Sequence, residues 1–361
     1  MRSATKVIAA VTVPLLTVSA CAIGAAAASD PVKPSRTATF PTHRPSDVVT
    51  SKVPSRNATP STRTSPSRSP VASPHRPSPV LPSYPRANRP CKGKIPEPFV
   101  GIATTGRFGM KVATFRHSTH THVRLVEFYN RFPGSFQRRE ALKVVRMHAL
   151  PLIQLNPTRI SIAKLAAGAY DSSIRSYARQ VKAFGCHVVL SLGHEMNGWW
   201  YPWGLPGTTP HAFKAAWRHF FNIFAAEHVT NVIWSWDPSH EHGHFRSGKV
   251  AWSASRWYPG NRYVDWIGVD GYFSPGHSFR DVLRFQLRNI RRLTHKPIYL
   301  AETGVADSAQ QAHQIAGLFA GIWKWHLIGL VWFDQDRRYS WSLGGKPRKD
   351  AAFRRAVARF P

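Results

Sequence analysis

The chain has 361 residues, enough for one large domain or two small ones, and its formal net charge at pH 7 is +31. Residues 1–92 hold 13 basic and 2 acidic residues, and the rest of the chain is basic as well. Such a charge favours anionic partners. The sequence has no zinc-finger spacing, no aromatic RNA-binding signature and no basic coiled-coil region. We therefore expect no nucleic-acid function, and an anionic cell-wall polymer is the better candidate for a charge-driven partner.

Residues 1–28 have the pattern of an export signal. Arg2 and Lys6 precede an uncharged run over residues 7–28, as in the basic and apolar regions of a secretory signal. Three outcomes are open: cleavage before a lipidated Cys21, cleavage after the alanines that end at residue 28, or retention as a signal anchor, because the uncharged run can just span a bilayer. In each case we expect a secreted or cell-surface tethered protein, attached to a membrane only through a lipid or a signal anchor.

Residues 29–92 are rich in Pro, Ser, Thr and Arg. A segment of this composition cannot bury enough apolar surface to offset the loss of chain entropy. We predict a disordered linker that is extended and partly polyproline II in character. It either carries the next domain through a cell wall or serves only as a connection.

From residue 93 onward, short apolar runs alternate with amphipathic stretches. The alternation predicts strands over residues 99–104, 123–128, 150–155, 187–192, 231–236, 264–270, 297–301 and 327–333. It predicts helices over residues 136–148, 172–184, 212–227, 279–293 and 309–325. Eight such units match a closed barrel. A doubly wound sheet would favour a glycine-rich phosphate loop after the first strand, and this sequence has none there. We predict an α/β fold, a (β/α)8 TIM barrel, over residues 93–361.

Two glutamates stand where predicted strands end. Glu195 follows the fourth strand and Glu302 the seventh, in a chain with only 18 acidic residues. The carboxyl ends of parallel strands share the face that holds the active site, so the two side chains are expected to meet there. Paired carboxylates are the acid and nucleophile of glycosidases, a mechanism that needs no cofactor and no metal. The hydroxyl of Tyr272 is a candidate to hold the ionised carboxylate.

A family resemblance extends over residues 99–345. The run GHEMNGWWYPWG at residues 193–204 resembles the strand-4 signature of glycoside hydrolase family 26, which is typified by β-mannanases. Shorter motifs resemble strands 6, 7 and 8 of that family in the correct order: WYPG at 257–260, YVDWIG at 263–268, DGY at 270–272, the segment from KPI to ETG at 296–304, and VWF at 331–333. The family has a retaining (β/α)8 architecture with the acid on strand 4 and the nucleophile on strand 7.

Carried over position by position, the resemblance implies that Glu195 is the acid/base and Glu302 the nucleophile. It implies substrate-binding or site-lining roles for His194, Asn197, Trp200, Tyr272 and Trp332, with Asn197 also holding the loop, Tyr272 bonded to the nucleophile, and Trp200 and Trp332 as sugar platforms. One position departs from the family, because Ser191 stands where an arginine is common. The implied function is a retaining endo-glycosidase acting on β-1,4-mannan.

Several alternatives stay open. The same mechanism fits a mixed-linkage β-1,3-1,4-glucan or a β-1,3-xylan, and a non-catalytic wall-binding barrel would keep the sugar cleft without turnover. His240, His242 and His244 flank Glu241, but this alternating spacing on a loop is poor evidence for a metal site. After export, Cys91 and Cys186 remain as an even pair and we predict that they are bonded. The polysaccharide substrate is the expected partner, and we expect a monomer.

Overall fold

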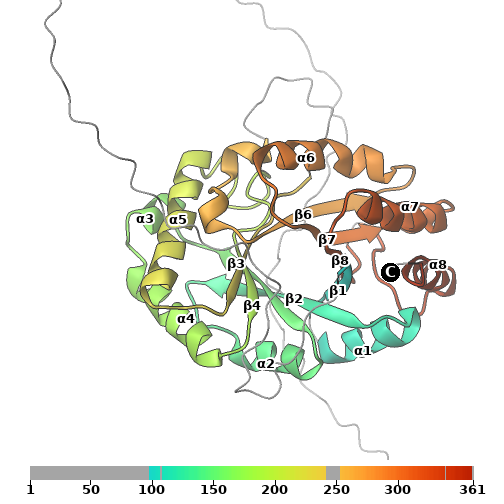
Figure 1. Ribbon diagram of the computed structural model, residues 1–361, viewed down its shortest axis with the longest axis horizontal. Helices are drawn as coiled ribbons and strands as arrows, with labels where there is room; N and C mark the ends of the chain where they lie inside the picture. The colour runs from blue at the N-terminus through green and yellow to red at the C-terminus, as the bar shows by residue number, and fades with distance from the viewer. Residues whose placement is uncertain (1–96, 106–107, 241–252, 338, 360–361) are drawn as a thin grey trace, which may run out of the picture. The chain divides into compact units, whose positions relative to one another are not determined.

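The computed structural model describes residues 97–105, 108–240, 253–337 and 339–359. In them, eight parallel strands close into a barrel in sequential order, and Figure 1 shows the helices as a ring around it. The strands are β1 Phe99–Ala103, β2 Val123–Phe132, β3 Leu150–Pro157, β4 Val188–Leu192, β5 Val232–Trp236, β6 Trp266–Phe273, β7 Ile298–Val305 and β8 Gly329–Phe333. This confirms the predicted (β/α)8 barrel, whereas the predicted signal and linker lie outside the described residues.

The helices follow the strands on the outer face of the barrel. They are α1 Phe108–Thr119, α2 Arg138–Arg146, α3 Ile162–Ala166, α4 Asp171–Phe184, α5 Pro210–Ala226, α6 Phe279–Leu293, α7 Gln311–Lys324 and α8 Pro347–Val357, with short 3-10 turns η2 Ala254–Trp257 and η3 Asn261–Tyr263 before β6. The five predicted helices end within a few residues of the observed ones. Local chemistry explains several boundaries: the Ser278 and Asp281 side chains form a reciprocal capping box at α6, and Thr209 followed by Pro210 starts α5.

Two apolar clusters hold this arrangement together. The larger one fills the space between strands and helices, and the smaller one fills the interior of the barrel. Inside, Phe99 stacks on Trp266 at a ring-centroid distance of 6.0 Å and lies 5.8 Å from Tyr299. These large rings close the amino-terminal end of the barrel, so the interior is a packed core and not a channel.

Toward the carboxyl ends of the strands, the interior changes from apolar to polar. Successive residues of a strand point to opposite faces, so every second residue points inward. The buried polar residues of this upper layer are Glu127, Gln154, Ser191, Ser235, Asp237 and Asp270. Gln154 donates from Nε2 to Asp237 Oδ2 at 3.1 Å. A polar layer therefore separates the apolar base of the barrel from the face that the sequence assigns to the active site.

Cys186 lies between α4 and β4, directly after Gly185, whose left-handed conformation (φ 78°) ends the helix. Cys186 is disulfide-bonded. The expected partner, Cys91, lies outside the described residues, so that pairing stays a prediction. None of the helices in the described ranges is long and apolar enough to cross a membrane.

Candidate active site

The loop after β4 presents Glu195 at the carboxyl face of the barrel. Gly193 and Glu195 both have positive φ angles, 63° and 51°, so the chain turns sharply where the strand ends. A glutamate rarely adopts this conformation, and such strain persists where the surroundings enforce it. Here the Glu195 backbone N–H donates to the Asp237 carbonyl oxygen at 2.7 Å. The turn and this hydrogen bond fix the backbone of Glu195, and the residue is only 8% exposed.

The surroundings of Glu195 favour its protonated form. Burial, and then the charge of Glu302, raise the pKa of Glu195 to about 8. Two donors act in the opposite direction: the Trp200 indole N–H, at 2.7 Å from Glu195 Oε2, and Ser239. Because the net shift is upward, Glu195 carries its proton near neutral pH. This is the state that a general acid requires.

Glu302, on β7, is also buried, but it has different surroundings. The Tyr129 hydroxyl donates to Glu302 Oε1 at 2.8 Å, and the Tyr272 hydroxyl donates to Oε2. Hydroxyl donors on both oxygens stabilise a carboxylate and fix its orientation. The predicted contact between Tyr272 and Glu302 is thus present, and Tyr129 adds a second donor.

His194 lies beside the two glutamates with both ring nitrogens occupied. Nδ1 is 3.1 Å from Asn156 Oδ1, and Nε2 is 3.1 Å from the Tyr201 hydroxyl. Burial lowers the pKa of His194, against a smaller opposing effect of the Glu302 charge, so the ring is neutral near pH 7. His194 therefore lines the site as an oriented neutral ring.

Asn197 connects two loops of the catalytic face. Its Nδ2 donates to the Ser239 carbonyl oxygen, and its Oδ1 accepts from the Ser239 backbone N–H, both at 2.9 Å. The loop-holding role expected for Asn197 is present in this geometry. Both the nitrogen and the oxygen of the side-chain amide bond Ser239, and the Asn197 side chain is buried.

The assignment of Trp332 as a sugar platform is wrong for this structure. Trp332 is 0% exposed, and its indole N–H donates to the Trp341 carbonyl oxygen at 3.0 Å. Its ring packs against Phe353 of α8 at 5.1 Å, on the helix side of β8. The ring that packs against Tyr272, the donor to Glu302, is Trp341, at 5.2 Å between ring centroids. A VWF motif cannot show which of its residues points inward when the strand is apolar on both faces.

Several polar residues of the site were not predicted from the sequence. Tyr129 and Glu127 lie within β2, and Asp237 and Asp270 lie at β5 and β6. One signal was available for Glu127: a carboxylate in the middle of an apolar strand is unusual unless it is functional or neutral.

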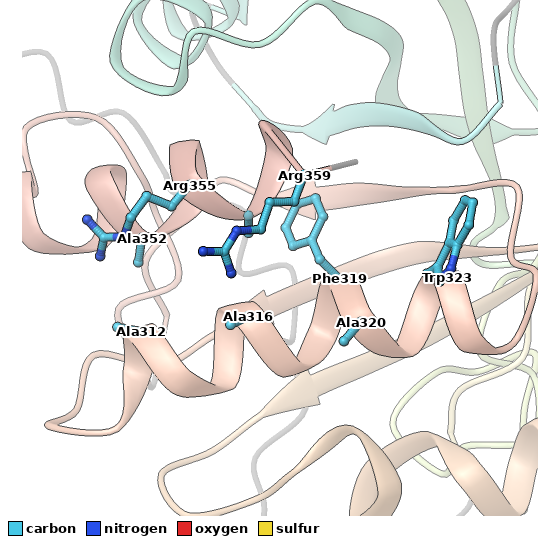
Figure 2. Close-up of a pocket in the computed structure, with 9 residues that line it drawn as sticks. Ala312, Ala316, Phe319, Ala320, Trp323, Ala352, Arg355 and Arg359 are labelled. Carbon is cyan, nitrogen blue, oxygen red and sulfur yellow. The ribbon is translucent and has the colours of Figure 1, made fainter. Parts of the chain in front are cut away.

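Two further features bear on the site. Across the described ranges, no three His, Cys, Asp or Glu side chains are arranged to hold a metal ion, and Glu241, His242 and His244 lie outside them. A pocket of about 280 Å³ lies on the outside of the barrel, between α7 and the end of the chain, and its lining includes Phe319 and Trp323 of α7, Arg355 of α8 and Arg359 (Figure 2). Its lining contains no carboxylate, so it is not the catalytic site.

Comparison with known proteins agrees with this geometry. Residues 162–324, which include both glutamates, match the glycosyl hydrolase family 26 pattern. Endoglucanase H of Acetivibrio thermocellus is 28% identical over 238 residues, covering 62% of this chain and 26% of that protein. Mannan endo-1,4-beta-mannosidase A and B of Caldalkalibacillus mannanilyticus is 29% identical over 173 residues, covering 44% of this chain and 31% of that protein.

The chain thus spans about a quarter to a third of the length of these curated relatives. Among solved structures, a modular endo-beta-1,4-mannanase from Cellulomonas fimi has a TM-score of 0.56 at 17% identity, over 73% of this chain and 70% of that one. That likeness concerns the fold. The matched pattern, the curated relatives and the positions of Glu195 and Glu302 together show that residues 162–324 of the chain are similar to glycoside hydrolase family 26.

Proposed function

We propose that this protein is a retaining endo-glycoside hydrolase that cleaves β-1,4-mannan. The observation that carries the proposal is the contrast between its two buried glutamates. The pKa of Glu195 is raised to about 8, whereas Glu302 accepts hydrogen bonds from the hydroxyls of Tyr129 and Tyr272. A retaining glycosidase needs one protonated carboxyl and one oriented carboxylate on the same face.

The reaction follows from these two states. In the first step a Glu302 oxygen attacks the anomeric carbon as the glycosidic C–O bond breaks, and Glu195 gives its proton to the departing oxygen. In the second step Glu195, now ionised, takes a proton from water. The water oxygen bonds to the anomeric carbon and releases Glu302, and Glu195 regains its proton. Two displacements leave the β configuration unchanged.

The loop after Glu195 offers aromatic surface for sugar rings. Trp200 is half-buried beside the acid, and Trp199 next to it is 51% exposed. The two indoles meet edge to face at 6.1 Å. We infer that these two rings bind the sugars next to the cleaved bond, a role that the buried Trp332 does not have.

A β-glucan is the second candidate substrate. The match to Endoglucanase H covers 62% of the chain, against 44% for the mannosidase from Caldalkalibacillus. The test is to incubate the purified protein with β-1,4-mannan, mixed-linkage β-1,3-1,4-glucan and β-1,3-xylan, and to measure reducing ends and product lengths. Release from mannan supports the main proposal, and release from glucan alone supports the second. If the protein binds these polysaccharides but releases reducing ends from none of them, and the Glu302→Ala variant binds them equally well, the result would favour a non-catalytic barrel.

We also propose that the chain is exported and is secreted or tethered at the cell surface. The basic and apolar amino terminus supports this, as does the disulfide at Cys186, because disulfides persist in oxidising compartments. Fractionation and amino-terminal mass analysis of the native protein test it; a cytoplasmic chain that still carries Met1 would contradict it.

The net charge of +31 supports a further proposal, adhesion to an anionic wall polymer. Such adhesion should weaken as salt shortens the Debye length to about 3 Å at 1 M. Adhesion to isolated cell wall that is equal at low and high salt would contradict an electrostatic origin.

A further inference from the structure

A third buried carboxyl, that of Glu127, lies under the nucleophile. Glu127 is 0% exposed and belongs to β2, between Leu125 and Tyr129. Leu125 packs in the apolar interior of the barrel, and Tyr129 donates to Glu302. Because alternate residues of a strand share a face, Glu127 also points into the barrel, one step nearer its base than Tyr129.

Among the described residues, the charged groups that act most strongly on Glu127 are all acids. None of the described residues donates a hydrogen bond to either of its carboxyl oxygens. Its neighbours in register on β1 and β3 are the apolar residues Ala103 and Leu152. The carboxyl groups that face it from the other strands are Glu302 on β7, Asp270 on β6 and Asp237 after β5. The other titratable groups that interact with its charge are the tyrosines Tyr129, Tyr201 and Tyr299.

A carboxylate without donors or a cation is strongly disfavoured in such a place. Two carboxyl groups that share a site also cannot both ionise, so one of them keeps a proton. Burial, and then the charge of Glu302, raise the pKa of Glu127 well above its ordinary value, and the two carboxyls are within hydrogen-bonding reach of each other. Only a protonated Glu127 can donate in that contact, because an ionised carboxylate has no hydrogen to give.

We propose that Glu127 is a positioning residue that stays protonated during turnover and donates its O–H to the carboxylate of Glu302. The nucleophile is then held by three neutral donors: the hydroxyls of Tyr129 and Tyr272 and the carboxylic acid of Glu127. Neutral donors fix the orientation of a carboxylate without cancelling the charge that attacks the sugar. This inference rests on the proposed role of Glu302 as the nucleophile.

Two substitutions separate the donor from the carboxyl group. Glu127→Gln keeps an N–H donor of similar size, and Glu127→Leu removes the donor. If the proposal is right, Glu127→Gln keeps kcat within about threefold and leaves the acid limb of the kcat/KM profile in place, because the neutral donor is retained. Glu127→Leu lowers kcat about 10- to 100-fold with KM unchanged, the loss that corresponds to one hydrogen bond to a charged group.

Two measurements need no turnover and so separate this proposal from the proposed function. At pH 7 the infrared difference between the wild type and Glu127→Gln should contain the carbonyl stretch of a protonated carboxylic acid. Asp334→Asn is the matched control: Asp334 is also buried, but its pKa is raised only to about 6, so the same comparison should show no such band.

The second measurement is thermal unfolding against pH. A raised pKa in the folded state means that the wild type loses stability as pH rises above the unfolded pKa of Glu127. The Tm of Glu127→Gln minus that of the wild type should therefore increase from about pH 5 to about pH 8. Four outcomes would each overturn the proposal: a kcat of Glu127→Gln as low as that of Glu127→Leu, an acid limb moved to lower pH, an absent infrared band, or a Tm difference independent of pH. The last three do not depend on whether the Leu variant folds.

Discussion

The end of β4 and the end of β7 both present a buried glutamate, but they surround it with different chemistry. At β4, Glu195 stands on a strained turn and receives one indole N–H from Trp200. At β7, Glu302 lies within the strand, where the register with β8 shifts between Leu300 and Thr303, and it receives two tyrosine hydroxyls. Desolvation outweighs the donors at Glu195 and raises its pKa to about 8.

The comparison shows that the two carboxyl groups differ in their neighbours, which is the basis of the roles we propose for them. The Trp200 indole and Ser239 do not compensate Glu195 for the loss of water, so this group keeps its proton. Donors on both oxygens, in contrast, fix the orientation of the Glu302 carboxyl group. Two copies of one residue type thus acquire different environments, as the proposed double displacement requires.

The largest expected effect comes from removing the carboxylate at β7. Glu302→Ala should lower turnover about 10⁴-fold or more on every substrate, because no covalent intermediate can form. Added azide should restore activity and yield an α-glycosyl azide, since azide takes the place of the nucleophile. Glu140→Ala is the control: Glu140 forms an exposed ion pair with Lys143 on α2, and its loss should leave turnover unchanged. Full activity of Glu302→Ala would remove this residue from the mechanism.

Removing the acid at β4 should have a smaller and substrate-dependent effect. Glu195→Ala should lose about 10²- to 10⁴-fold on polysaccharide, where the leaving oxygen needs a proton. On an aryl glycoside with a good leaving group the first step should stay fast and the glycosyl-enzyme should accumulate. Azide should give a β-product here. The opposite pair of azide stereochemistries in the two variants would mean that the two regions have exchanged roles.

Removing one donor at β7 tests the positioning of Glu302. Tyr272→Phe and Tyr129→Phe should each lower kcat about 10- to 100-fold, as expected for one lost hydrogen bond to a charged group. The double variant measures the coupling of the two donors. An unchanged kcat in both single variants would show that the hydroxyls do not hold the nucleophile.

The smallest expected effect concerns the pH profile. Glu195 must be protonated to act as the acid, so activity should fall as pH rises past about 8. The Trp200 indole lowers the pKa of Glu195, so its removal raises that pKa further. In Trp200→Phe the alkaline limb should therefore move to higher pH, by less than about one unit. A shift to lower pH would contradict the assignment of the limb to Glu195.

Much of the barrel can be predicted from local pattern. The apolar runs end at Glu195 and Glu302, and parallel strands bring such ends to one face whatever lies between them. The residues that complete the site cannot be found in this way, because they come from other strands. Tyr129 is 173 positions from Glu302, and only closure of the barrel brings its hydroxyl to the carboxylate.

The sequence by itself thus determined the barrel, its catalytic face and the two glutamates, because strand alternation and strand ends are local features. Tertiary structure decided the direction and the environment of side chains. Trp332 is buried because Phe353 of α8 and the Trp341 carbonyl cover it. Glu195 holds its proton because the folded loop excludes water from it. Burial and electrostatic coupling depend on every element that packs around a group, and no single segment of the sequence contains that information.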